Sequence, residues 1–198
     1  MILIDLKKNM AKRLFDIVFA LFTLLLFSWL LLILWCIAIV DTCTNGVFIQ
    51  ERIGQFGKKF KIYKFRTIRD SASSEERRIS KTAQFLRKYK LDELPQLFNV
   101  LKGNMSIVGT RPDLPGYYDL LEGENRKILE LKPGLTSLAS LKYYNEEKLL
   151  AQQQDPLWFN DQVIFPDKVR LNLLYFYNHS FWGDIKIIMK TFSFIFNK

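Results

Sequence analysis

Two adjacent carboxylates, Asp92 and Glu93, stand near the start of a stretch that reads LDELPQLFNVLKG. Asp is a favoured N-cap residue, and acidic side chains near a helix N-terminus interact favourably with the helix dipole. The same position lowers the pKa of a carboxyl group and keeps it ionised, so Asp92 could attack a phosphoryl group. Glu93 could hold Mg²⁺, which prefers carboxylate and phosphate oxygens. The pattern alone leaves capping and catalysis open.

The residues after the pair predict the element that positions it. Apolar side chains recur at the i, i+3, i+4, i+7 spacing of an amphipathic helix, at Leu94, Leu97, Phe98 and Leu101. Gly103 is suited to end this helix. We expect the apolar side chains to root the helix in the core and its first turn to hold Asp92 charged and exposed.

Two segments before this helix carry basic side chains. Residues 46–68 alternate apolar and basic side chains in places, which predicts an extended segment or a hairpin with Gly54 and Gly57 at its turn. Residues 82–90, TAQFLRKYK, predict a short helix.

Positive charge is concentrated in one part of the chain. The net charge is +9, and residues 52–90 hold thirteen Lys and Arg but only three Asp and Glu, so this segment accounts for the whole excess. Such a segment predicts an anionic partner, which could be a nucleic acid, an anionic lipid or a phosphorylated small molecule. Cys36 and Cys43 lack CxxC spacing, and the chain has a single His, so neither a disulfide framework nor a zinc cluster is expected.

An apolar segment from Ile17 to Val40 contains no charged residue. As a straight helix it would be about 36 Å long, enough to cross a hydrocarbon core of about 30 Å. Basic residues flank both ends, however, and positive charge marks the cytoplasmic side, so both ends favour the same face. A re-entrant helix satisfies this, and the hydroxyl of Ser28 could bend it by binding a carbonyl one turn back. Charge and length leave both topologies open.

The C-terminal segment, FWGDIKIIMKTFSFIF, predicts an amphipathic helix. Its apolar residues fall roughly on one face, with Lys186 and Lys190 toward the other. The pattern suits a core helix, and the apolar segment elsewhere in the chain favours a helix that lies in the membrane interface.

Three blocks of the chain resemble the bacterial sugar transferases, and more narrowly the small monotopic phosphoglycosyl transferases that act on polyprenol phosphate. The blocks read QERIGQFGKKFKIYKFRTI, LDELPQLFNVLKGNMSIVGTRP and KPGLTS, and the resemblance runs from about Lys12 to Thr191. It implies a mainly helical α/β fold, with a re-entrant membrane anchor over residues 1–45 and a catalytic domain over residues 46–198. That domain would rest, with interfacial amphipathic helices, on the cytoplasmic face of the bacterial inner membrane.

The resemblance also implies an enzymatic activity. Asp92 would attack the inner phosphate of a UDP-sugar, UMP would leave, and a covalent sugar-phosphoryl aspartate would remain. Polyprenyl (undecaprenyl) phosphate would then take the sugar phosphate, in the first membrane step of surface glycan assembly. Glu93 would bind Mg²⁺ as the cofactor. Candidate phosphate contacts are Lys64 and Arg66 of YKFRT, Arg87, and Arg111 of GTRP.

The chain departs from the family pattern at several positions. Ser28-Trp29 replaces Ser-Pro at the bend of the anchor, and Asn104 replaces the Asp of GDMS. Ser137 replaces a Gly in PGITGW, and Asn172 replaces an Asp near the C-terminus. The last two changes lie where nucleotide or sugar contacts are expected, so the resemblance does not extend to the identity of the sugar.

Two rival functions fit parts of the sequence. A membrane-anchored scaffold of a glycan assembly complex would share the anchor, but the retained Asp-Glu pair and YKFRT argue against a decayed site. Nucleic-acid binding would use the aromatic and basic side chains that interleave at residues 60–65. The long apolar segment argues against that function, and we expect no nucleic-acid partner.

Overall fold

The computed structural model describes residues 2–69 and 79–196, so part of the basic segment, residues 70–78, lies outside the described residues. The chain divides into two compact units. The first comprises Met1–Glu51, Phe60–Met105 and Ile195–Lys198, and the second comprises Arg52–Lys59 and Ser106–Phe194. Asp92 and Glu93 lie in the first unit and Arg111 in the second.

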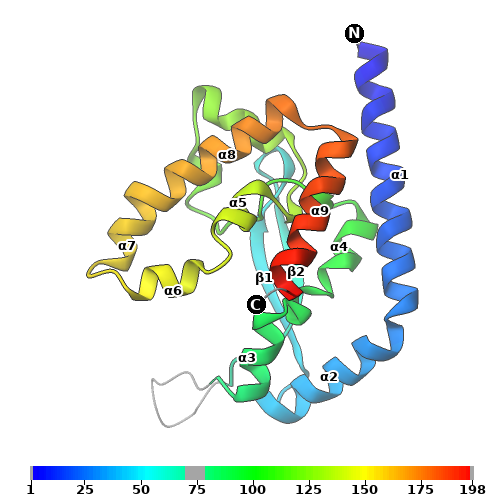
Figure 1. The fold of residues 1–198 in the computed structure, drawn as a ribbon, viewed down its shortest axis with the longest axis vertical. Coiled ribbons are helices and arrows are strands. Elements are labelled where there is room, and N and C mark those ends of the chain that lie inside the picture. Colours follow the sequence, from blue (N-terminus) through cyan, green and yellow to red (C-terminus); the bar gives the residue numbers. More distant parts are fainter. Residues whose placement is uncertain (1, 70–78, 197–198) are drawn as a thin grey trace. The chain divides into compact units, whose positions relative to one another are not determined.

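The apolar segment forms two helices with a sharp bend between them (Figure 1). Helix α1 (Ile2–Leu26) and helix α2 (Ser28–Thr42) meet at 69°, and Ser28 Oγ donates to the carbonyl of Leu25 at 3.0 Å. The predicted bend at Ser28 is therefore confirmed. No single described helix is long and apolar enough to cross a membrane, whereas this bent pair meets that test together, by length and composition alone.

The rest of the first unit surrounds the catalytic candidates. It contains most of the hairpin strands β1 (Val47–Ile53) and β2 (Lys59–Phe65), followed by α3 (Lys81–Lys88), the 3₁₀ turn η2 (Leu91–Glu93) and α4 (Gln96–Lys102). The hairpin turn, η1 (Gln55–Gly57), belongs to the second unit. Both the predicted hairpin, with Gly54 and Gly57 at its turn, and the predicted short helix before the pair are confirmed.

A shared apolar cluster joins α2 to the candidate site. Leu34 and Ala38 of α2 pack with Phe65 of β2 and Leu86 of α3, and partly buried Leu91 and Leu94 pack against them. Leu91 and Leu94 flank Asp92 and Glu93 in the chain, so burial of their side chains fixes the turn that carries the pair.

Helix α1 also holds α4, which lies beside it in Figure 1. The guanidinium of Arg13 donates to the carbonyls of Val100 (2.7 Å) and Leu101 (3.1 Å), near the end of α4. The last carbonyls of a helix have no partner within it and carry the negative end of its dipole. Arg13 therefore places a fixed positive charge at this end, where the Val100 carbonyl also accepts from the Gly103 N–H at 3.0 Å, and the predicted helix end is confirmed at Gly103, whose φ is 85°.

The second unit contains a small parallel sheet and most of the remaining helices. Strands β3 (Ser106–Val108) and β4 (Gly134–Thr136) pair Ser106 with Gly134 and Val108 with Thr136. The 3₁₀ segments are η3 (Tyr118–Leu120) and η4 (Gly123–Glu130), and the α-helices are α5 (Leu138–Lys142), α6 (Glu146–Ala151), α7 (Pro156–Phe159), α8 (Phe165–Asn178) and α9 (Phe181–Phe196). One π-helical turn, η5 (Asn160–Ile164), joins α7 to α8. The prediction of a mainly helical fold with small sheets is confirmed.

The backbones of GTRP and KPGLT approach each other closely in this unit. The Gly109 N–H donates to the Thr136 carbonyl at 3.1 Å, and the Gly134 N–H donates to the Thr110 carbonyl at 2.6 Å. A Cβ on Gly134 would lie 2.1 Å from the nitrogen of Gly109, so only glycine fits there. This pairing fixes the loop that leads to Arg111.

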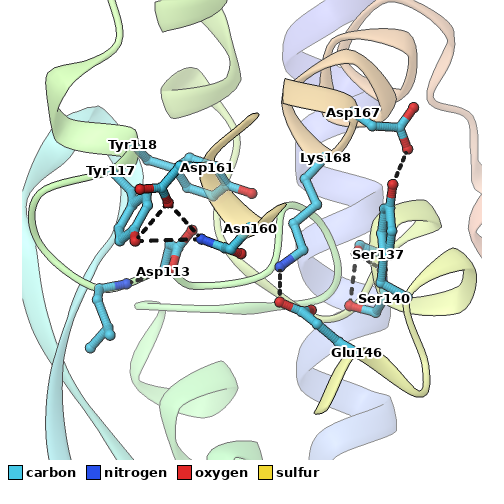
Figure 2. Close-up of polar contacts among 12 residues, drawn as sticks. Asp113, Tyr117, Tyr118, Ser137, Ser140, Glu146, Asn160, Asp161, Asp167 and Lys168 are labelled. Atoms are coloured by element: carbon cyan, nitrogen blue, oxygen red, sulfur yellow. Dashed lines mark hydrogen bonds and ion pairs between the residues drawn. The ribbon is translucent and has the colours of Figure 1, made fainter. Parts of the chain in front are cut away.

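A layer of paired polar side chains supports the helices of the second unit (Figure 2). Lys168 of α8 binds Glu146 at 2.6 Å, and the hydroxyl of Tyr117 donates to Asp161 at 3.1 Å. Asp167 accepts from the hydroxyl of Tyr143 at 2.8 Å. These contacts join segments about 22 to 44 residues apart in the chain, so they hold α6 and η5 in place.

Helix α9 exposes a long aromatic face. Asp184, Ile187 and Ile188 are buried, whereas Trp182 is 73% exposed and Met189 and Phe196 follow it at seven-residue intervals, also exposed. The apolar residues of α9 are therefore divided between a buried side and an exposed side. Lys186 and Lys190 are exposed beside the aromatic stripe.

Candidate active site

Asp92 and Glu93 lie in a 3₁₀ turn ahead of α4 and not at its N-cap. Lys90 precedes the turn in the left-handed conformation, with φ 55°, and Pro95 occupies the N-cap position of α4. No side chain caps either element. The capping role that the sequence left open for Asp92 is therefore excluded, because the strained backbone at Lys90 and the rigid ring of Pro95 begin two separate elements here.

The expectation of an exposed, low-pKa Asp92 is also wrong. Asp92 is 8% exposed and Glu93 is 7% exposed. Burial, and next the charge of Glu93, raise the pKa of Asp92 to about 6, although Lys64, Lys90 and Arg87 act in the opposite direction. Desolvation of the carboxylate outweighs the cations because the apolar cluster around Leu91 and Leu94 keeps water from the turn.

One carboxylate oxygen of the pair lacks a hydrogen-bond partner. Asp92 Oδ1 is buried and has no hydrogen-bond partner. Buried polar atoms in native proteins are nearly always hydrogen-bonded, and an unpaired one costs free energy. An orphaned oxygen of this kind is typical of a site that is completed by substrate or metal.

The cations predicted to contact phosphate fall into two groups. Lys64 Nζ lies 2.9 Å from Glu93 Oε1, and Arg87 is close enough to Asp92 to lower its pKa, so both belong to the neighbourhood of the pair. Arg66 directly follows the last residue of β2, and its guanidinium carbon lies 5.9 Å from the centre of the Phe48 ring. Arg111 lies in the second unit, near Tyr118.

Helix α4 buries a different face from the predicted one. Leu97 and Val100 are buried together with polar Gln96 and Asn99, whereas Phe98 is 48% exposed. The helix begins at Gln96, after the separate turn, so its rotation differs from that of one continuous helix starting at Leu91.

Two residues near the pair make contacts that the sequence motifs did not predict. Asn99 is 1% exposed and its side chain binds the backbone of β2, while Arg13 binds the end of α4. In the sequence, Asn99 stands out as a polar residue inside the apolar run LFNVL. Arg13 stands out as a basic residue just before the apolar segment.

The structure also places the residues at which the chain departs from the family pattern. Ser137 caps α5, accepting from the Ser140 N–H at 2.8 Å. Asn172 is 1% exposed and donates to the hydroxyl of Tyr118 at 2.8 Å, so it is part of the core of the second unit. Asn104 is exposed.

The pair offers few groups to a metal ion. Within residues 10–69 and 79–196, no group of three or more His, Cys, Asp or Glu side chains is placed to hold one. Mg²⁺, however, is commonly bound through one or two carboxylates plus substrate phosphates and water. Two adjacent carboxylates with one orphaned oxygen fit that arrangement.

The family model described as "Bacterial sugar transferase" matches residues 7–198, nearly the whole chain. The chain belongs to this family. It is 37% identical over 188 residues to the uncharacterized sugar transferase EpsL of Bacillus subtilis, covering 91% of this chain and 84% of EpsL.

Two relatives with a stated activity are longer proteins. The chain is 35% identical to the UDP-glucose:undecaprenyl-phosphate glucose-1-phosphate transferase of Klebsiella pneumoniae, over 91% of this chain and 39% of that protein. It is also 35% identical to the Escherichia coli protein of the same name, over 92% of this chain and 39% of that protein. The chain thus spans well under half the length of these two relatives.

Proposed function

We propose that this family member transfers a sugar 1-phosphate from a UDP-sugar to undecaprenyl phosphate and releases UMP. Family membership and the names of the relatives support the reaction class. The observation that carries the proposal is the buried Asp92, whose Oδ1 has no partner and lies beside Glu93 and several cations.

The reaction proceeds in two displacements at one phosphorus atom. The ionised carboxylate of Asp92 attacks the phosphorus that carries the sugar, an O–P bond forms, and the bond to the bridging oxygen breaks, so UMP leaves. An oxygen of undecaprenyl phosphate then attacks the same phosphorus, the bond to Asp92 breaks, and the carboxylate is regenerated. The chain's cations stabilise charge on the phosphoryl oxygens, with Lys64 and Arg87 near the pair and Arg66 and Arg111 as further candidates.

Glu93 is the residue proposed to hold Mg²⁺. Bound there, the ion would neutralise charge on the diphosphate of the donor. Lys64 binds one oxygen of Glu93 at 2.9 Å, which orients the carboxylate before any metal or substrate arrives.

The anchor is proposed to enter and leave the cytoplasmic face of the inner membrane. A 69° bend between α1 and α2 and basic residues on both flanks support a re-entrant path. The exposed aromatic stripe of α9, with Lys186 and Lys190 beside it, supports contact with the membrane interface.

Single cysteines test this topology. Cysteines placed at residue 3 and at residue 60, in a Cys36→Ser/Cys43→Ser background, are both expected to react with a membrane-impermeant maleimide only after cells are opened. Labelling of residue 3 in intact spheroplasts, with residue 60 protected, would show instead that the anchor spans the membrane.

A donor screen tests the activity. The purified protein is incubated with undecaprenyl phosphate, Mg²⁺ and a panel of UDP-sugars, and UMP is measured. We expect UMP release with at least one donor. Multiple turnovers should require undecaprenyl phosphate, and EDTA should abolish the release. Absence of UMP with every donor, from protein shown to be folded, would favour a scaffold without catalysis.

The pH dependence of turnover follows from the burial of Asp92. Its pKa is raised to about 6, and only the ionised form is a nucleophile, so kcat/KM should fall as the pH drops through about 6. If the aspartate had an ordinary pKa, kcat/KM would fall only near pH 4. Arg87→Gln removes a cation that lowers the pKa of Asp92, so it should move this fall in kcat/KM to higher pH. A profile that stays flat down to pH 5 would contradict the assignment of Asp92.

A further inference from the structure

Asn99 joins helix α4 to the strand that carries Lys64. Its side-chain Nδ2 donates to the Lys61 carbonyl at 2.7 Å, and its Oδ1 accepts from the Tyr63 N–H at 3.2 Å. The C=O and N–H groups of residues two apart on a strand point to the same edge. The amide of Asn99 therefore occupies an edge of β2 as the backbone of a neighbouring strand would.

The strand needs such a contact to keep its place. Among the described residues, strand β2 pairs in a two-stranded sheet, which is marginally stable without further packing. A slip of one residue would turn every side chain of the strand to the opposite face. Lys64 directly follows Tyr63, so fixing the backbone of Tyr63 fixes the direction in which Lys64 points.

The other end of this connection is the catalytic pair. Lys64 Nζ reaches Glu93 Oε1 at 2.9 Å, and Glu93 lies three residues before the first residue of α4. Asn99 is itself 1% exposed, and its backbone carbonyl accepts from the N–H groups of Asn104 (3.0 Å) and Met105 (3.2 Å). One residue thus holds β2, α4 and the chain that leaves α4.

We propose that Asn99 is a positioning residue of the transfer reaction, whose side-chain amide sets the register of β2 and so places the Lys64 ammonium against Glu93. The inference rests on the proposed function for its role in turnover. The clamp on β2 itself does not depend on that function, and the two are measured separately.

A double-mutant cycle tests the role in turnover. Asn99→Leu keeps the size of the side chain and removes both hydrogen bonds, and it is made with Lys64 intact and in a Lys64→Met background. With Lys64 intact, kcat/KM for the UDP-sugar should fall about 10- to 100-fold, because small displacements of a catalytic group cost factors of this size. In the Lys64→Met background the further loss should be under about threefold, because the two residues act as one unit.

Equal fold losses in both backgrounds would overturn the proposal, since Asn99 would then act on the fold in general. Asn99→Asp, which keeps the acceptor for the Tyr63 N–H and loses the donor to Lys61, provides a second variant if Asn99→Leu folds poorly. It should show a smaller loss that also disappears in the Lys64→Met background. Asn178→Leu, at an exposed site on α8, is the matched control and should leave kcat/KM unchanged.

Hydrogen exchange tests the clamp without any turnover. In Asn99→Leu the Tyr63 amide should exchange at least about tenfold faster than in the wild type, because its acceptor is lost. Unchanged exchange at Tyr63 would overturn the proposal even if turnover fell. A wild type that shows the expected exchange but releases no UMP would instead refute the proposed function and with it the role of Asn99 in catalysis.

Discussion

Asp92→Asn should abolish sugar-phosphate transfer while making the protein more stable. The amide has no charge with which to attack phosphorus, and loss of a covalent nucleophile typically lowers kcat by about 10³-fold or more. UMP release under multiple turnover measures this loss. Asp155→Asn, which also removes one negative charge but keeps a good N-cap for α7, is the matched control and should retain turnover.

The gain in stability follows from the direction of the pKa shift. The pKa of Asp92 rises from 3.8 to about 6 in the folded protein, so the fold disfavours the charged carboxylate. The cost is fully present above pH 6, reaches about 3 kcal/mol at most, and disappears as the pH falls toward 4. Denaturant unfolding at pH 7.5 should show the gain in Asp92→Asn, and at pH 4.5 most of it should vanish. An active or destabilised Asp92→Asn would contradict the account.

Lys64→Met should have the second largest effect, on both stability and turnover. Lys64 and Glu93 form a largely buried ion pair, with side chains 18% and 9% exposed. Removing one partner of a buried pair leaves an uncompensated charge and costs about 3 kcal/mol or more. The pKa of Asp92 should rise further, because Lys64 is the strongest of the cations that lower it. We expect kcat/KM at pH 7.5 to fall at least about 100-fold.

The double variant Lys64→Met/Glu93→Gln separates the two effects. In the double variant neither side chain is charged, so no charge is buried without a partner. Most of the stability that is lost in Lys64→Met should therefore return. Turnover should not recover with the stability, because the proposed metal-binding carboxylate is gone. Lys61→Met, on the same strand with an exposed side chain, should change neither quantity appreciably. Recovery of activity in the double variant would refute the roles of both residues.

Local patterns predicted those parts of the fold that depend on neighbouring residues. The bend at Ser28 needs only a hydroxyl and a carbonyl one turn back, and the hairpin needs only Gly54 and Gly57 between alternating strands. Gly103 ends α4 because glycine adopts φ 85° without strain. Each of these features is set within a few residues of sequence.

The environment of Asp92 depends on residues far away in the chain, and it was predicted wrongly. Leu34 and Ala38 lie more than 50 residues before Asp92, yet the cluster that contains them buries the turn. Helix propensity says nothing about this burial, so the sequence predicted an exposed, low-pKa carboxylate. Asn99 was missed for a similar reason, since its partners are on a strand 36 and 38 residues away.

Trapping the covalent intermediate tests the central claim most directly. The protein is incubated with an active UDP-sugar labelled in the sugar, with Mg²⁺ and without undecaprenyl phosphate, and is then denatured and analysed by intact-protein and peptide mass spectrometry. The account predicts a mass increase of one sugar phosphate on the peptide that contains Asp92, lost on addition of undecaprenyl phosphate before denaturation and absent in Asp92→Asn. UMP release by an active protein with no label on Asp92, or with label retained in Asp92→Asn, would contradict it.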